Sequence, residues 1–268
     1  MTILDEKGDN GTFKSPVNTN LCGTCVQPIG VAINQDSGLA AVTDTLNNTA
    51  NCTNSSSTNN GGSVASFVVV GATADTATGN ACVDYISLAI AIDPAPFNDT
   101  SQDIAAVTTA SQTNALNLLP LPSGTPARIS MQLPTGVVFD SLNQVFLVAD
   151  STANTVILVD PLTSEKIFTV RTGINPTSVD YNFNTSSLVT SNAASNTLSV
   201  LDYACPPNPN GVSNCPVPQV REVLDVGSVE PTASVIVGPN SLAIDPRLNL
   251  VVQIEEANNR ILLVPLPH

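Results

Sequence analysis

Short polar side chains recur at the start of one turn in a segment that is repeated along this 268-residue sequence. Each follows an apolar run, as Asp150 follows "VFLVA". Carboxylate and amide oxygens are the ligands that Ca²⁺ prefers, and the ion takes roughly six to eight of them. If these turns lie on one rim of the fold, they predict a calcium site there. Its candidate ligands are Asp44, Asp150, Asn192, Glu255 and the adjacent Glu256, whereas one repeat has Ala110 at this position.

The same side chains also suit a structural role, because short polar side chains at turns hydrogen-bond to nearby backbone groups. In the stretch "DSTANT", Asp150 is expected to accept such bonds, and Asn154 to tolerate a left-handed backbone. A second polar series follows the first apolar strand of each repeat, and turn geometry alone explains it. It consists of Asn34, Asp93, Asp140, Asn182 and Asp245.

Most catalytic arrangements are excluded by what the sequence lacks. The one histidine is the last residue, His268, so the sequence predicts no Ser-His-Asp site. G-x-S-x-G, H-E-x-x-H and P-loop motifs are absent. The remaining enzyme hypothesis is a calcium-dependent hydrolase of a small lactone or ester. In it the rim residues hold the ion, Glu256 acts as the base, and no other cofactor is needed.

Six cysteines in a chain with few lysines are typical of exported, disulfide-bonded proteins. Many connectivities are open to six cysteines, so the pairing rests on proximity in the sequence. The favoured pairs are Cys22 with Cys25, Cys205 with Cys215 and, by elimination, Cys52 with Cys82. "LCGTCV" is alternatively a redox site, but the βαβ context of such a site is absent. A zinc site is disfavoured because no second C-x-x-C or histidine cluster is present.

The polar turn belongs to a longer unit that occurs five times. The copies start near residues 28, 86, 133, 175 and 238, so their spacings are 58, 47, 42 and 63 residues. Each copy contains short runs of valine, isoleucine and leucine between asparagine, aspartate, glycine and proline, which is typical of strands and turns. Runs such as "VFLVA" are apolar without alternation, which predicts strands covered on both faces. Units of this length suit four-stranded blades around an axis.

The stretch "PTGVVFDSLNQVFLVADSTANTVILVD" (134–160) resembles the NHL and YVTN types of β-propeller repeat. Those units have the form P-x-G-V-A-x-D, then V-A-D or V-A-N, then N-x-V or N-R-I. The resemblance covers residues 28–264; the third and fifth copies are close, and the second lacks the proline and glycine. It implies an all-β propeller and leaves the activity open. Similarity to gluconolactonase-like and strictosidine-synthase-like propellers implies acidic and amide groups around an axial pocket.

Five copies predict one domain over residues 1–268, a propeller with five four-stranded blades. The last copy ends after its third strand. "TILDEKGDNGTFKSPV" (2–17) is predicted to form a strand or a hairpin that supplies the missing outer strand and closes the ring. The segment 1–27 therefore contains the closing strand and Cys22 and Cys25. A six-bladed ring, with a divergent blade in 202–236 or 1–27, is the alternative.

The composition limits location and partners. The net charge of −14 repels phosphate backbones and anionic lipid headgroups, so neither nucleic-acid nor membrane-surface binding is expected. No apolar run is long enough to insert into a membrane. The first residues do not resemble a signal peptide. The cysteines nevertheless predict an extracellular, cell-surface or periplasmic location, with a leader or neighbouring segments missing.

The leading functional hypothesis is a non-enzymatic extracellular module for binding or structural interaction, within a larger surface protein. It would contact a protein or cell-surface partner through its rim and two insertions, 47–62 and 203–219. The first alternative is the calcium-dependent lactonase or esterase. The second is a self-assembling structural protein whose open sheet edges pair with neighbouring subunits.

Overall fold

The structure is a computed structural model in which every regular element is a β-strand. Short runs of β-branched and aliphatic residues between turn-forming residues account for this extended backbone. The all-β prediction is confirmed for the residues that the structure describes. These are 2–3, 17–18, 28–34, 39–44, 63–69, 76–83, 86–93, 103–110, 114–121, 125–202, 219–226, 241–255 and 260–267.

Five sheets of consecutive antiparallel strands make up most of the fold, and they are named sheets 1 to 5 in chain order. Sheet 1 contains β3 (Pro28–Asn34), β4 (Leu39–Asp44), β5 (Ser63–Val69) and β6 (Thr76–Val83). Sheet 2 contains β7 (Ile86–Asp93), β8 (Ile104–Ala110), β9 (Ala115–Pro120) and β10 (Ala127–Ser130). Sheet 3 contains β11 (Pro134–Asp140), β12 (Val145–Asp150), β13 (Thr155–Val159) and β14 (Lys166–Arg171). Sheet 4 contains β15 (Pro176–Asn182), β16 (Ser187–Asn192), β17 (Thr197–Asp202) and β18 (Gln219–Asp225). Sheet 5 contains β19 (Leu242–Asp245), β20 (Leu250–Glu255) and β21 (Arg260–Pro265).

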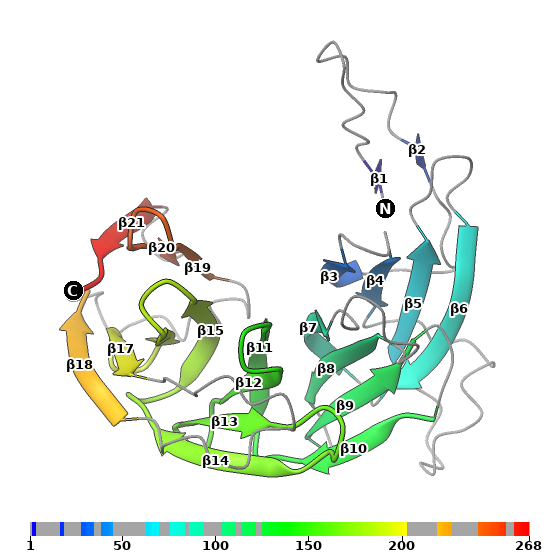
Figure 1. Cartoon of the computed structure of the whole chain (residues 1–268), viewed down its shortest axis with the longest axis horizontal. Coiled ribbons are helices and arrows are strands. Elements are labelled where there is room, and N and C mark those ends of the chain that lie inside the picture. Colours follow the sequence, from blue (N-terminus) through cyan, green and yellow to red (C-terminus); the bar gives the residue numbers. More distant parts are fainter. Residues whose placement is uncertain are drawn as a thin grey trace.

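The sheets follow one another along an arc, with sheet 1 and sheet 5 at its two ends (Figure 1). The first strand of each sheet lies on the inner side of the arc, and the last strand lies on the outer side. Within the described residues, sheets 1 to 4 have four strands and sheet 5 has three. This arrangement is the predicted β-propeller architecture of four-stranded blades.

Neighbouring sheets pack face to face, with one apolar cluster at each of the four junctions. Between sheets 3 and 4, Leu147 and Leu158 pack against Val179 and Tyr181. Every residue of β12 and β13 is buried, so both faces of these strands are covered. The prediction drawn from the non-alternating apolar runs is therefore confirmed in the middle of the arc, where each sheet has a neighbour on both sides.

The repeat is visible in the backbone as well as in the sequence. A register shift occurs near the start of the first strand pair in sheets 1 to 4. In sheet 3 it lies between Pro134 and Gly136. A Cβ atom on Gly136 would lie 2.9 Å from the carbonyl oxygen of Thr177 and 3.0 Å from Cα of Ser178, both in sheet 4. Glycine at this bulge therefore permits two inner strands to approach closely.

Replacing Gly136 by alanine is expected to lower the free energy of unfolding by about 2 kcal/mol, because the methyl group meets backbone atoms that cannot rotate away. The matched control is Gly30→Ala at the same place in sheet 1. There the close atoms belong to side chains rather than to the backbone: Cγ2 of Ile90 at 2.9 Å and Oγ1 of Thr43 at 3.1 Å. Urea denaturation of both variants measures the two costs. Equal losses of unfolding free energy would show that contact with backbone atoms at Gly136 costs no more than contact with side chains at Gly30.

Within the N-terminal segment 1–27 the structure describes two short strands. β1 (Thr2–Ile3) pairs antiparallel with β2 (Val17–Asn18) in a separate two-stranded sheet. Figure 1 shows these two strands near the end of the arc that carries sheet 1, away from β21. The rest of the segment 1–27 lies outside the described residues, so closure of the ring by an N-terminal strand remains a prediction.

Several sequence predictions fall outside the described residues. Five of the cysteines do so entirely, and only the backbone of Cys82 is described, within β6. The insertion 47–62 and most of the insertion 203–219 are also outside, so the disulfide pairing remains a prediction. In the part of the chain that is described, no helix is long and apolar enough to cross a membrane.

Candidate functional site

The predicted calcium ligands lie at one end of the sheets, which we call the hairpin face. It carries the hairpins between second and third strands and the loops that lead into first strands. Asp150 and Asn192 end β12 and β16, the second strands of sheets 3 and 4. The backbones of Asp44 and Glu255 end the second strands of sheets 1 and 5, but their side chains lie outside the description, as does all of Glu256.

Asp150 uses both carboxylate oxygens to hold its own sheet together. It is buried, with 1% of its surface exposed. Oδ2 accepts a hydrogen bond from the backbone N–H of Gln132 at 2.8 Å, and Oδ1 accepts one from Leu133 at 2.8 Å. Oδ1 also accepts from the N–H of Ala153 at 3.3 Å, within the hairpin. The carboxylate therefore ties the loop before β11 to the hairpin after β12.

The hairpin itself has the backbone that its sequence predicts. Asn154 has a φ of 57°, in the left-handed region that asparagine tolerates. Asn196 occupies the same place in sheet 4 and has a φ of 52°. The prediction that Asp150 caps this turn and Asn154 reverses it is confirmed.

Asn192 belongs to a buried network of side chains. Its Nδ2 donates to Oγ1 of Thr197 at 3.1 Å and to Oγ of Ser199 at 2.9 Å. Its Oδ1 accepts a hydrogen bond from Oγ1 of Thr190 at 2.9 Å. Ser199 in turn accepts from the backbone N–H of Gly173 at 3.0 Å. The amide thus links two strands of sheet 4 to the loop that leads into it.

The two predicted ligands whose side chains are described, Asp150 and Asn192, act as structural hydrogen-bond partners. Among the described residues, no group of three or more histidine, cysteine, aspartate or glutamate side chains is placed to hold a metal ion. Three of the five predicted ligands lie outside the described side chains, so the calcium site as a whole remains a prediction.

The opposite end of the sheets, which we call the turn face, carries the turns between first and second strands and between third and fourth strands. In sheet 3, Oδ1 of Asp140 accepts from the N–H groups of Leu142 at 2.9 Å and Asn143 at 3.2 Å. In sheet 5, Oδ1 of Asp245 accepts from Arg247 at 2.9 Å and Leu248 at 3.3 Å. The turn-capping explanation of this second polar series is therefore confirmed at these positions.

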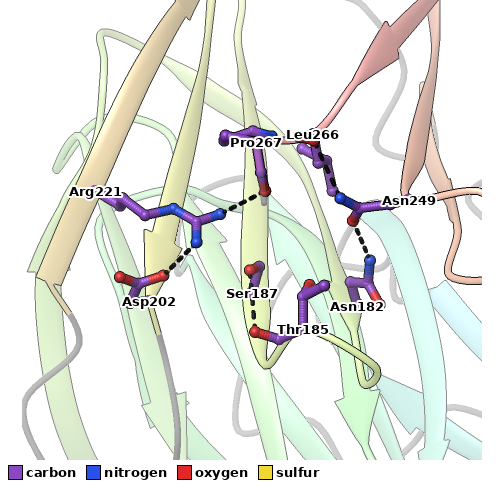
Figure 2. Close-up of polar contacts among 8 residues, drawn as sticks. All are labelled: Asn182, Thr185, Ser187, Asp202, Arg221, Asn249, Leu266 and Pro267. Carbon is purple, nitrogen blue, oxygen red and sulfur yellow. Dashed lines mark hydrogen bonds and ion pairs between the residues drawn. The ribbon is translucent and has the colours of Figure 1, made fainter.

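Some members of this series also connect neighbouring sheets. Nδ2 of Asn34 in sheet 1 donates at 2.8 Å to Oδ2 of Asp103, which immediately precedes β8 of sheet 2. Nδ2 of Asn182 in sheet 4 donates to Oδ1 of Asn249 at 2.8 Å, next to β20 of sheet 5 (Figure 2). Asn249 then donates to the carbonyl oxygen of Leu266 at 3.0 Å. These amides join the sheets at the inner side of the arc.

Arg221 adds a second connection between sheets 4 and 5. Its guanidinium lies 3.2 Å from a carboxylate oxygen of Asp202 on the adjacent strand. The same group donates to the carbonyl oxygen of Pro267 at 3.2 Å (Figure 2). The outer strand of sheet 4 therefore holds the segment that follows β21.

Asp93, the member of this series in sheet 2, lacks such a connection. Its side chain is buried, and Oδ1 has no hydrogen-bond partner. Burial, together with the negative charges of Asp103 and Asp160, raises the pKa of Asp93 to about 7. Sequence reasoning treated Asp93 as an ordinary turn residue, because neither its burial nor its charged neighbours can be read from the chain.

The turn face also carries exposed apolar side chains that sequence reasoning missed. Leu142, Phe183 and Leu248 occur in the same turn of sheets 3, 4 and 5, with exposed fractions of 48%, 57% and 69%. Leu162, in the next turn of sheet 3, is also exposed. Each is a single apolar residue between polar ones, so the sequence offered no signal until the turns were aligned.

Comparisons with known proteins support the fold and no specific activity. No protein-family model matches the chain, and no curated protein matches it. Solved structures do resemble it. A periplasmic gluconolactonase from Pseudomonas aeruginosa is 12% identical, with a TM-score of 0.62 over 98% of this chain and 77% of that chain. A functionally unknown protein from Desulfotomaculum acetoxidans is 11% identical, with a TM-score of 0.58 over 98% and 75%. A protein from Lactobacillus plantarum is 9% identical, with a TM-score of 0.62 over 95% and 74%.

Proposed function

We propose that this chain is a propeller of the NHL or YVTN repeat type that works outside the cytoplasm as a non-enzymatic binding module. It contacts a protein or cell-surface partner through the turn face. The repeat type is supported by the register shifts and left-handed asparagines at equivalent places in successive sheets. An extracellular, cell-surface or periplasmic location is supported by the six cysteines and by the fold shared with a periplasmic protein.

The contrast between the two faces carries the proposal. On the turn face, Leu142, Phe183 and Leu248 form a row of exposed apolar side chains, one in the same turn of each of three adjacent sheets, although at different places within that turn. Single exposed apolar residues are ordinary, but a repeated row indicates a contact surface. On the hairpin face, Asp150 and Asn192 are committed to hydrogen bonds inside the fold. The described polar groups of the hairpin face therefore fit a structural role better than a catalytic role.

The chemistry of the partner follows from the row and from the charge. Leucine and phenylalanine side chains on a polar rim fit a partner surface with an apolar centre, as protein interfaces have. The net charge of −14 disfavours nucleic acid and anionic membranes. A protein or a neutral cell-surface polymer is therefore the expected partner.

The test measures binding of the fluorescently labelled protein to cells of the producing strain. The triple variant Leu142→Ser, Phe183→Ser, Leu248→Ser is expected to lose at least tenfold in apparent affinity, because the apolar row is removed without touching the core. The control is Ile174→Ser, an exposed apolar residue on the hairpin face, which should bind like the wild type. Unchanged binding of the triple variant, with loss in the control, would assign binding to the other face.

A calcium-dependent lactonase or esterase is the second candidate. It is supported by the fold that the chain shares with a gluconolactonase and by the acidic residues that end β4 and β20 on the hairpin face. In this candidate Asp44, Asp150, Asn192 and Glu255 hold the ion and Glu256 is the base. A calcium-dependent rise in melting temperature, together with turnover of a small lactone, would favour it over the binding module.

A further inference from the structure

The two end sheets of the arc each present an exposed apolar face. On sheet 1, alternate residues of β3 point away from sheet 2, and we call them the leading face: Ile29, Val31 and Ile33. On sheet 5, residues of all three strands point away from sheet 4, and we call them the trailing face: Ala243, Ile254, Ile261 and Leu263. Pairing across the strands places Ile254 opposite Ile261, so the trailing face is continuous.

These residues occupy positions that are buried between sheets elsewhere in the arc. Leu263 is 62% exposed, whereas Leu158 and Val200 at the same position of sheets 3 and 4 are 0% exposed. Those two side chains pack against the sheet that follows. The trailing face therefore resembles one side of the junction that recurs between the sheets, but none of the described sheets packs against it.

The leading face is the complementary half of the same junction. Val31 is 55% exposed. Its equivalents in sheets 2 and 3, Ile90 and Val137, are buried against the sheet that precedes them. A leading face thus fits a trailing face in the way that sheet 4 fits sheet 3. Each chain carries one face of each kind, at opposite ends of the arc (Figure 1).

The ends of one arc are not placed to satisfy each other. Figure 1 shows sheets 1 and 5 standing apart. Among the described residues, no strand of sheet 1 pairs with a strand of sheet 5. Junctions with backbone contact, as at Gly136, also resist a tighter curve.

We propose that the leading face of one copy packs against the trailing face of a second copy, so that the chain associates head to tail. The contact is heterologous: it buries two different faces, and each added copy leaves one of each exposed. Both faces are apolar, while every copy carries a net charge of −14. Association should therefore strengthen with added salt, which screens the repulsion between copies and favours apolar burial.

The test is sedimentation velocity on the full chain across a range of protein concentrations, in low and high NaCl. The wild type is expected to associate as concentration and salt increase. Val31→Asp blocks the leading face and Ile261→Asp blocks the trailing face, so each variant alone should remain monomeric. A mixture of the two should form a one-to-one dimer, because each supplies the face that the other retains. Ile33→Asp and Leu263→Asp are the second variants if either first choice fails to fold.

Leu162→Asp is the matched control, since Leu162 is 79% exposed and lies on the turn face but outside the row tested for binding. It should associate like the wild type. A wild type that stays monomeric at every concentration and salt overturns the proposal. So does a mixture that fails to dimerise, or association that depends on only one of the two end faces. The result is independent of the turn-face binding proposed above, which the cell-binding assay reports.

Discussion

Replacing Asp150 by alanine is expected to lower the free energy of unfolding by about 3 kcal/mol, because hydrogen bonds to a buried charged group are strong and their loss leaves donors unpaired. The carboxylate accepts from the backbone N–H groups of Gln132, Leu133 and Ala153. Alanine offers none of them an acceptor. Water cannot replace the carboxylate easily, because the position is buried.

Urea denaturation of Asp150→Ala and Asp150→Asn measures this effect. Asparagine keeps one acceptor oxygen, so Asp150→Asn should lower the free energy of unfolding by less than Asp150→Ala does. Asp245→Ala is the matched control: Asp245 caps a turn through the N–H groups of Arg247 and Leu248, but in an exposed setting. Its cost should be near 1 kcal/mol, the usual value of one net hydrogen bond. A cost for Asp150→Ala no larger than that of the control would contradict the structural role.

The same variants separate the structural role from the calcium candidate. Wild-type and Asp150→Asn proteins are melted in EDTA and in millimolar Ca²⁺. Binding to the folded state alone stabilises by about 2.7 kcal/mol at one hundred times Kd. If Asp150 is only a cap, adding calcium should leave the melting temperature of each protein unchanged, even though the variant melts lower than the wild type. A calcium-dependent rise in the wild type that Asp150→Asn abolishes would instead support the hydrolase candidate.

Replacing Asp93 by asparagine is expected to stabilise the protein by roughly 3 kcal/mol at pH 8 and by little at pH 4. The pKa of Asp93 is raised from 3.8 to about 7 by burial and by the charges of Asp103 and Asp160. The folded state therefore holds a proton that the unfolded chain releases near pH 4. The stability linked to that proton is present below about pH 4 and is lost as the pH rises through about 7.

The measurement is the free energy of unfolding of wild type and Asp93→Asn at several pH values between 4 and 8. The difference between the two proteins isolates Asp93 from other groups. Asp180, whose pKa burial also raises, changes the pH dependence of both proteins equally. The values at pH 4 control for the change of side chain, because the wild-type carboxyl is then neutral. A difference that stays constant from pH 4 to pH 8 would show that Asp93 does not bind the proton in the folded state.

The sequence alone determined the repeating unit, because its signals are local. Non-alternating apolar runs predicted strands covered on both faces, and β12 and β13 are buried throughout. Asp150 and Asn154 predicted a tight hairpin, which the structure contains. Hydrogen bonds between a side chain and the next few residues depend only on nearby sequence, so turns of this kind can be predicted from it.

Only the tertiary structure decided what the repeated positions do, because burial and partners depend on neighbours that are distant in the chain. Leu158 and Leu263 occupy equivalent positions, yet one is buried between sheets and the other is exposed at the end of the arc. Asp93 and Asp140 both end an inner strand, but only Asp93 has a buried oxygen without a partner. In each case the local pattern is shared, and the different outcome comes from which sheet, if any, lies alongside.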